Sequence, residues 1–178
     1  MKTRIALILA LVLIIFNGGC QPEKEMKLNI ETVKNLDLQR YLGKWYEIAR
    51  FDHRFERGMV GVTATYSLLD DGKIKVLNEG FEYAFEGKHS VAEGKAKLTD
   101  VPGVLKVSFF WIFYAQYRVL ELDENYQWAL VGGNSEKYLW ILSRTPQLDD
   151  QTKGFILKKA EKRGYDISKL IWVKQKSE

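Results

Sequence analysis

The sequence predicts an all-β domain: about eight short antiparallel strands forming a barrel or a sandwich, then one helix and a short final strand. Apolar and polar residues alternate with a period of two between residues 43 and 144. Turn-forming residues interrupt this alternation at short intervals, as in antiparallel sheets. After residue 146 the apolar spacing becomes that of an amphipathic helix. The 178 residues suffice for one domain with a sizeable core.

The start of the chain has the features of a signal peptide rather than of a folded element. Lys2 and Arg4 supply a basic beginning, residues 5–16 are an unbroken apolar run, and two glycines precede Cys20. The apolar run is shorter than the roughly 20 residues that cross a bilayer. We therefore expect residues 1–19 to be removed.

Cys20 is the only cysteine, which excludes an intramolecular disulfide. Its place directly after the leader resembles that of the lipidated cysteine in bacterial lipoproteins, with Asn17 standing where their signal usually has leucine. The resemblance implies acylation of Cys20, and Gln21, which is not aspartate, implies sorting to the outer membrane. Acyl chains contribute about 0.8 kcal/mol per buried CH₂, so more than one chain gives stable anchoring. The alternative is an ordinary secretory peptide that leaves a free thiol.

These features divide the chain into three expected parts. Residues 1–19 are the signal peptide, residues 20–35 a lipidated tether, and residues 36–178 the folded domain. The tether is polar, which suits a flexible connection. We expect it to anchor the domain on the outer membrane, facing the periplasm.

The charge of the mature chain argues against a nucleic-acid partner. Lys2 and Arg4 leave with the leader, so 25 of the 27 basic residues remain against 23 acidic ones. No basic run is interleaved with aromatic residues. Only two histidines are present, His53 and His89, and neither has metal-ligand spacing. The sequence therefore implies no metal and no cofactor, and it argues against an enzyme.

The first strands follow from alternation and turn signals. The segment from Tyr41 to Glu47 opens the first strand, and residues 61–68 form the second. Residues 70–72 read Asp-Asp-Gly, a hairpin turn, before alternation resumes at residues 73–79. One face of the second strand carries Val62, Ala64, Tyr66 and Leu68.

The later strands are separated by glycine and proline signals. Gly80, Gly87 and Gly94 punctuate the next strands. Further strands are expected within residues 105–122, with a break near Trp111, and at residues 127–131 and 138–143. The helix is expected from Asp149 or Asp150 to Arg163, because acidic residues begin it, basic residues end it and Gly164 stops it. Residues 170–173 form the final strand.

Three separated segments resemble the lipocalin family. They are the Gly43-Lys44-Trp45-Tyr46 motif, the turn and strand at residues 123–131, and Arg144 at the end of the eighth strand. The resemblance implies an eight-stranded antiparallel up-and-down barrel with one C-terminal helix and a short final strand. In that family the tryptophan closes the barrel base and the arginine lies over its ring, which implies a structural cation–π pair for Trp45 and Arg144.

Two further stretches, residues 46–58 and 138–146, resemble bacterial outer-membrane lipocalins, the branch akin to apolipoprotein D. That resemblance implies a lipoprotein that binds fatty acids or lysophospholipids and that stores or transports them for envelope maintenance under stress. An apolar barrel interior favours an acyl chain by roughly 25 cal/mol per Å² removed from water. The candidate cavity residues are Val62, Ala64, Tyr66, Ile74, Val76, Tyr114 and Trp140.

Alternatives stand beside each of these hypotheses. The cavity residues would also suit a filled barrel, which would make the protein a structural envelope lipoprotein or an interaction module without a ligand. Arg54 and Arg57, in the loop expected across the barrel mouth, are candidates for binding a lipid head group or are solvated charges. Trp111, Ile112 and Phe113 form an apolar cluster that would contact a membrane or a second protomer of a homodimer, or would pack in the barrel wall.

Overall fold

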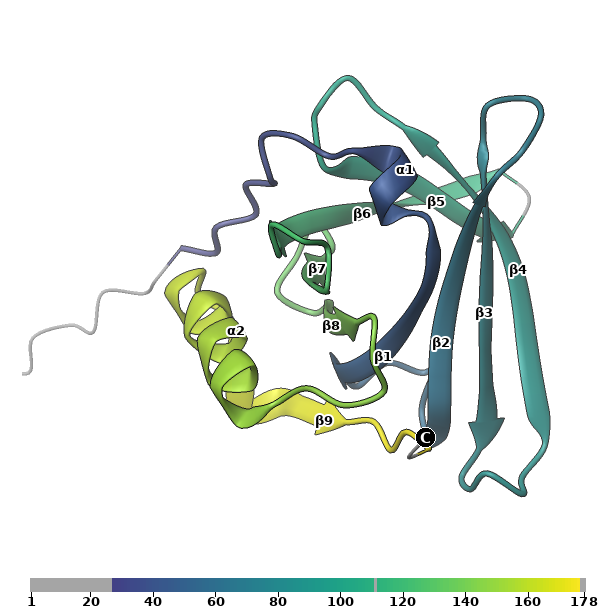
Figure 1. Ribbon diagram of the computed structural model, residues 1–178, viewed down its shortest axis with the longest axis vertical. Helices are drawn as coiled ribbons and strands as arrows, with labels where there is room; N and C mark the ends of the chain where they lie inside the picture. The colour runs from purple at the N-terminus through teal and green to yellow at the C-terminus, as the bar shows by residue number, and fades with distance from the viewer. Residues whose placement is uncertain (1–26, 111, 177–178) are drawn as a thin grey trace, which may run out of the picture.

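Nine strands form one antiparallel sheet in the computed structural model, which describes residues 27–110 and 112–176 (Figure 1). The predicted signal peptide, Cys20 and Trp111 lie outside the described residues. The strands are β1 (Gly43–Phe51), β2 (Met59–Leu68), β3 (Ile74–Glu82), β4 (His89–Leu98), β5 (Val104–Phe110), β6 (Phe113–Leu122), β7 (Trp128–Gly132), β8 (Leu139–Ser143) and β9 (Leu170–Trp172). The helical elements are α1 (Leu38–Tyr41), α2 (Asp150–Lys162) and a 3₁₀ turn, η1 (Ile167–Lys169).

The first eight strands close on themselves. Each strand pairs with the next one along the chain, and β1 pairs with both β2 and β8. This closure confirms the eight-stranded up-and-down barrel and excludes the sandwich. The predicted break in residues 105–122 is present, since β5 ends at Phe110 and β6 begins at Phe113.

The final strand β9 lies outside the barrel, on the edge of β1 that β2 has left. β1 pairs with β2 only from Gly43 to Tyr46, and from Ala49 to Phe51 it pairs with β9 instead. The amide of Gly61 in β2 donates to the carbonyl of Lys174, at 2.7 Å. The C-terminal segment therefore bridges the seam that opens between β1 and β2.

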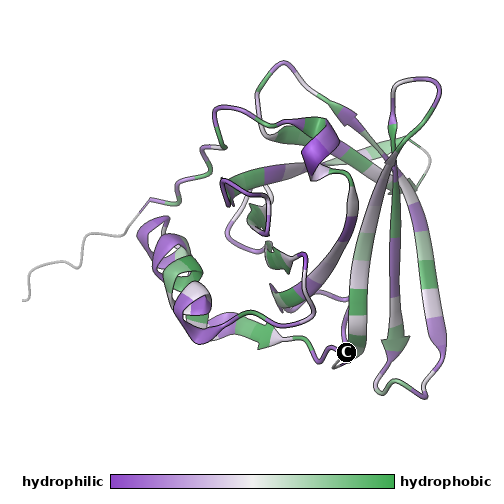
Figure 2. Cartoon of the chain, viewed as in Figure 1, coloured by the Kyte–Doolittle hydropathy of each residue, from purple (hydrophilic) through white to green (hydrophobic). Residues whose placement is uncertain are grey.

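Alternation along the strands separates an inner core from an outer one, and Figure 2 shows it as bands along the strands. In β7 and β8, Ala129, Val131 and Leu142 belong to the cluster inside the barrel. Leu130 and Ile141 belong to a second cluster on the outer wall, under α2. The inner cluster forms the barrel interior, and the outer cluster attaches the helix.

The helix α2 begins and ends where its sequence predicts. The Asp149 side chain accepts from the amide of Thr152 at 2.8 Å, which caps the first turn. Gly164 follows the helix with a φ of +92°, a conformation that glycine adopts without strain. Ile156 and Ala160 are buried against the barrel wall.

The narrow end of the barrel is closed by α1 and by Arg144. The guanidinium of Arg144 lies 3.7 Å from the centroid of the Trp45 ring. It also donates to the carbonyls of Lys44, Arg40, Leu42 and Tyr126 at 2.7–3.3 Å. One side chain thus joins the start of β1, α1 and the turn before β7. We call this the closed end.

Residues 27–35, expected as part of a flexible tether, are bound to the barrel instead. The amide of Asn29 donates to the carbonyl of Arg163, and that of Val33 to Val119. Thr32 donates its hydroxyl to the carbonyl of Pro102 at 2.6 Å. Although this segment is mostly polar, it contains two apolar anchors: Leu28 packs against the outer cluster and Val33 against the inner one. Among the described residues, no helix is long and apolar enough to cross a membrane.

Candidate functional site

Four loops surround the open end of the barrel. In an up-and-down barrel the loops after β1, β3, β5 and β7 lie at the same end, opposite α1 and Trp45. They comprise residues 52–58, 83–88 and 133–138, together with Ile112 between β5 and β6. We call the loop at residues 52–58 the mouth loop.

The barrel interior is apolar toward the closed end. Of the predicted cavity residues, Tyr66, Ile74 and Val76 are buried in the inner cluster, and Ala64 and Trp140 pack against it. Val62 is also buried. The remaining buried members of this cluster are Tyr41, Trp45, Ala96, Leu105, Val119, Tyr126, Ala129, Val131 and Leu142.

Three tyrosine hydroxyls meet inside this apolar region. Tyr117 lies within hydrogen-bond distance of Tyr41, and the hydroxyl of Tyr66 donates to that of Tyr117 at 3.1 Å. Burial raises the pKa of Tyr66 to about 12. The three phenols therefore stay neutral at physiological pH and satisfy one another.

Tyr114 is a correction to the predicted cavity set. Tyr117 points into the barrel, so Tyr114, three residues earlier in β6, lies on the opposite face. The ammonium of Lys97 sits 4.8 Å from the centroid of the Tyr114 ring on that outer face. Gln116 and Arg118 lie on the same outer face as Tyr114. Their polar side chains at alternate positions were the sequence signal that Tyr114 points outward.

Sequence reasoning missed an ion pair inside the barrel. Glu47 and Arg50 of β1 are only 4% and 1% exposed, and Arg50 Nη1 donates to Glu47 Oε1 at 2.7 Å. Residues three apart in a regular strand point to opposite faces. Here the pairing register between β1 and β8 shifts between Glu47 and Ala49, and this bulge turns both side chains inward.

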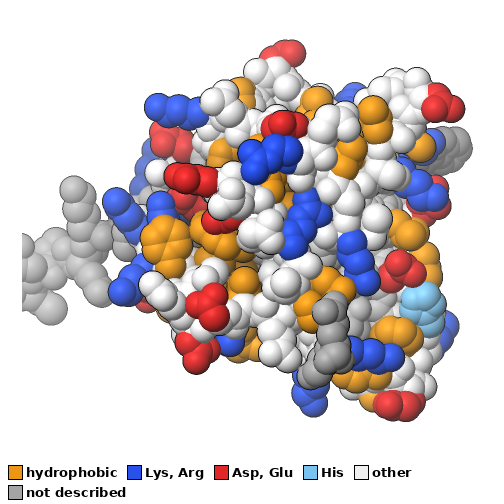
Figure 3. Space-filling model, in the orientation of Figure 1, with side chains coloured by type: hydrophobic (Ala, Val, Ile, Leu, Met, Phe, Trp, Pro, Cys, Tyr) orange, Lys and Arg blue, Asp and Glu red, His pale blue; other side chains and the backbone are white. Residues whose placement is uncertain are grey.

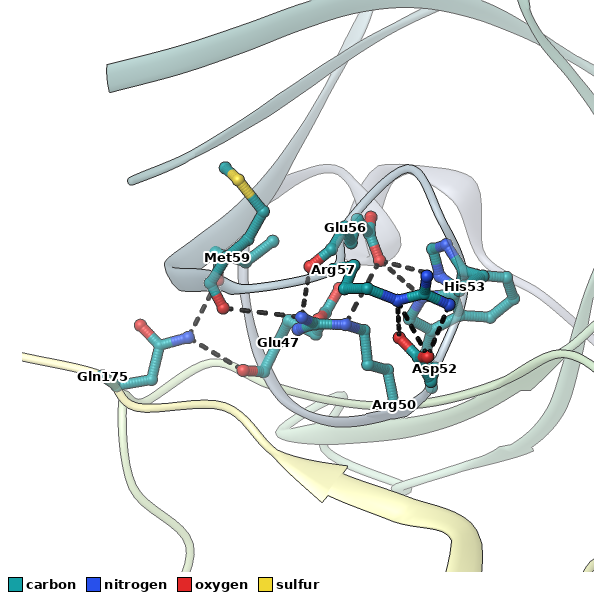
Figure 4. A network of polar contacts seen from close by, with 10 residues as sticks. Glu47, Arg50, Asp52, His53, Glu56, Arg57, Met59 and Gln175 are labelled. Carbon is teal, nitrogen blue, oxygen red and sulfur yellow. Dashed lines mark hydrogen bonds and ion pairs between the residues drawn. The ribbon is translucent and has the colours of Figure 1, made fainter. Parts of the chain in front are cut away.

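The mouth loop extends this pair into a network (Figure 4). The Oε2 atom of Glu56 lies 3.0 Å from His53 Nε2 and accepts from Trp140 Nε1 at 3.2 Å. It lies 4.0 Å from Arg50 Nε. Arg50 also donates to the backbone carbonyl of Glu56. The mouth loop is therefore held to the barrel wall through one carboxylate and one guanidinium.

The two carboxylates of the network differ in their protonation. Burial, and then repulsion by Glu56, raises the pKa of Glu47 well above its ordinary value. Burial acts on Glu56 in the same direction, but hydrogen bonds from His53 and Trp140 and the charge of Arg50 lower its pKa overall. Glu56 is thus the acid that keeps its negative charge at lower pH.

The two predicted head-group residues lie on the exposed side of the mouth loop. Arg57 Nη2 forms an ion pair of 2.7 Å with Asp52. The guanidinium of Arg54 lies 4.9 Å from the centroid of the Phe55 ring. Neither side chain joins the buried network, in which Arg50 supplies the guanidinium.

An apolar tip projects at the same end of the barrel. Ile112 and Phe113 are 71% and 77% exposed, and Phe110 beside them is exposed as well. Elsewhere the surface is mixed in charge: Figure 3 shows basic and acidic side chains interspersed over one face. Among the described residues, no group of three or more His, Cys, Asp or Glu side chains is placed to hold a metal ion.

A closed antiparallel barrel, apolar at its base and polar at its mouth, defines the class of small up-and-down barrels, whose interior is filled by side chains or holds one small ligand. The family described as "Lipocalin-like domain" matches residues 36–175. The chain therefore belongs to the lipocalin family.

Three proteins illustrate the similarity in sequence. Outer membrane lipoprotein Blc of Escherichia coli (strain K12) is 53% identical over 148 residues, 82% of this chain and 83% of that protein. Its namesake in Citrobacter freundii is 49% identical over 173 residues, 96% of this chain and 95% of that protein. Apolipoprotein D of Mus musculus is 35% identical, covering 80% of this chain and 78% of that protein. The chain is therefore a bacterial-type outer-membrane lipocalin of the branch akin to apolipoprotein D.

Solved structures show the same fold at lower sequence identity. Insecticyanin from the tobacco hornworm Manduca sexta superposes with a TM-score of 0.69 at 21% identity, covering 85% of this chain and 87% of that one. Lobster apocrustacyanin A1 superposes with a TM-score of 0.64 at 20% identity, covering 78% and 79%. These likenesses support the barrel architecture.

Proposed function

We propose that this lipocalin binds one single-chain lipid, a fatty acid or a lysophospholipid, inside its barrel. It acts as a binding protein rather than an enzyme. The observation that carries the proposal is the division of the interior: Tyr66, Ile74 and Val76 line an apolar base, while Glu47 and Arg50 place charges near the mouth. An acyl chain suits the first region and a polar head group the second.

We propose further that the protein stores or carries this lipid at the outer membrane, for envelope maintenance under stress. A lipid on Cys20 would hold the barrel there, facing the periplasm. The support is the position of Cys20 after an apolar leader and the similarity to outer membrane lipoproteins. Residues 20–26 would connect a lipid on Cys20 to the barrel, since the chain contacts the barrel from Leu28 onward.

Native mass spectrometry tests lipid binding directly. The soluble form from Gln21 onward would be purified and offered fatty acids, lysophospholipids and a neutral retinoid. We expect one fatty acid or lysophospholipid to be retained per barrel, and we expect Trp140→Ala to reduce retention. Tyr114→Ala is the matched control, because this aromatic side chain lies on the outer face. A barrel that takes up none of these lipids would support the structural or interaction role.

The apolar tip supports a second contact, with a membrane or with a second protomer. We propose this contact because Phe110, Ile112 and Phe113 are all exposed at one end of the barrel. We expect Ile112→Asp to lower liposome binding or to shift a dimer toward monomer in sedimentation. An unchanged result in both assays would contradict the proposal.

A further inference from the structure

Three donors converge on a carboxylate that belongs to the mouth loop itself. Arg50 of β1 and His53 of the mouth loop both lie beside Oε2 of Glu56 (Figure 4). Trp140 of β8 donates to the same oxygen at 3.2 Å. Indole, guanidinium and imidazole N–H groups around one oxygen are the donors that a protein uses to bind an anion. The loop thus places its own anion at a site built largely by the barrel wall.

The charges of this site admit no additional anion. Arg50 is the buried cation of the network, and the carboxylates of Glu47 and Glu56 both lie beside it, at 2.7 and 4.0 Å. These two carboxylates already balance its charge. A further carboxylate or phosphate entering beside Glu56 would meet its negative charge, so an incoming anion has to replace Glu56.

One N–H donor at this site lacks a hydrogen-bond acceptor. Arg50 Nε is buried and makes no hydrogen bond, although it lies 4.0 Å from Glu56 Oε2. A buried donor without a partner costs about 1–3 kcal/mol. A head group with two or three acceptor oxygens would satisfy Arg50 better than Glu56 does.

We propose that Arg50 and Trp140 form the anion-binding site for the head group of a single-chain lipid, and that Glu56 of the mouth loop occupies this site until the lipid displaces it. The inference rests on the proposed function and assigns its polar subsite. Glu56 serves as an internal competitor: it closes the mouth loop over the barrel and lowers the affinity for anionic lipids. An uncharged lipid of the same length gains nothing from the exchange.

The test compares three ligands that share a sixteen-carbon chain: palmitate, hexadecyl phosphate and hexadecanol. Binding is measured by calorimetry on the soluble form from Gln21 onward. Glu56→Gln keeps the size of the side chain but removes its charge. We expect it to bind palmitate and hexadecyl phosphate about tenfold more tightly, while its affinity for hexadecanol changes less than about twofold. The two anions show whether a carboxylate or a phosphate fits the site better.

Two further variants make the result specific. Glu86→Gln removes the same charge from an exposed residue at the same end of the barrel, and we expect it to leave all three affinities unchanged. In an Arg50→Gln background, Glu56→Gln is expected to give no gain for either anion, because the two residues act on one site. If Arg50→Gln does not fold, the affinities of Glu56→Gln for the two anions and for hexadecanol still decide whether Glu56 competes with the head group.

Hydrogen exchange supplies an independent readout. The amides of Glu56 and Met59 are bonded within the mouth loop, so palmitate should accelerate their exchange and hexadecanol should not. Equal affinities of native chain and Glu56→Gln for palmitate would overturn the inference and leave the lipid-binding function intact. Failure of the native chain to bind any of the three ligands would overturn the proposed function itself.

Discussion

Single side chains decide how both ends of this barrel are closed. At the closed end, Arg144 stacks on Trp45 and donates to several carbonyls. At the mouth, Arg50 joins the carboxylate of Glu47 to the backbone of the mouth loop. In both places a guanidinium connects segments that are distant in sequence, because its fixed planar fork donates to several acceptors at once.

Replacing Arg144 should therefore weaken the whole barrel. We expect Arg144→Ala to lower the free energy of unfolding by about 2–4 kcal/mol, because several carbonyls lose a donor and the Trp45 ring loses its cation. Urea unfolding followed by tryptophan fluorescence measures the change. Arg54→Ala is the control: its guanidinium also lies over a ring but is exposed, so its cost should stay within about 0.5 kcal/mol.

The raised pKa of Glu47 makes stability depend on pH. Burial raises this pKa, so the folded chain binds the Glu47 proton more tightly than the unfolded chain does. This contribution is complete below the unfolded pKa and disappears as the pH rises through the folded value. We expect the stability of Glu47→Gln, relative to the native chain, to increase across that interval. Unfolding curves at successive pH values measure the difference, and a difference independent of pH would contradict the assignment.

At the scale of elements, the N-terminal segment is part of the domain. Residues 27–35 donate backbone hydrogen bonds to the turn after α2 and to β6, and Leu28 and Val33 pack against the two cores. The segment itself forms no regular strand or helix, and its position is fixed by contacts with residues far along the chain. A polar composition alone therefore suggested a tether.

Truncation tests whether residues 27–35 belong to the folded domain or form a free tether. We expect a chain that begins at residue 36 to be less stable than one that begins at residue 27, by roughly 2–4 kcal/mol, because it loses two apolar anchors and their hydrogen bonds. Thermal or urea unfolding of the two forms measures the difference. Equal stability would mean that residues 27–35 behave as a free tether.

Periodicity predicted the elements well, because strand and helix spacing follow from local geometry. The eight barrel strands, the helix α2 and β9 lie close to their predicted positions. The orientation of side chains was less predictable wherever a strand is irregular. The bulge after Glu47 turns both Glu47 and Arg50 inward, and no single-sequence pattern marks such a bulge. The buried ion pair of the mouth therefore escaped sequence analysis.

At the scale of the whole molecule, the barrel and its anchor have separate roles. The fold provides a closed wall with an apolar interior, and the attachment is proposed to lie at Cys20. The similarity to outer membrane lipoproteins extends over most of the chain. Location and binding are therefore expected to be separable by mutation.

Replacing Cys20 tests this separation. We expect full-length Cys20→Ser to lose incorporation of radiolabelled palmitate in bacterial cells and to move from the membrane fraction to the soluble one. Lipid binding by the barrel should be unchanged, since the residues proposed to bind the lipid all lie between Glu47 and Trp140. A variant that stays membrane-bound and labelled would place the acylation elsewhere.

The bridging of the β1–β2 seam by the C-terminal segment has a consequence for how the protein is made. Residues 170–175 bond to β1 and β2, near the beginning of the domain. A chain emerging from the ribosome or from an export channel presents β1 and β2 long before it presents this segment. The seam can therefore be sealed only once the last residues of the chain are available, and the edge of β1 that β9 covers stays unpaired until then.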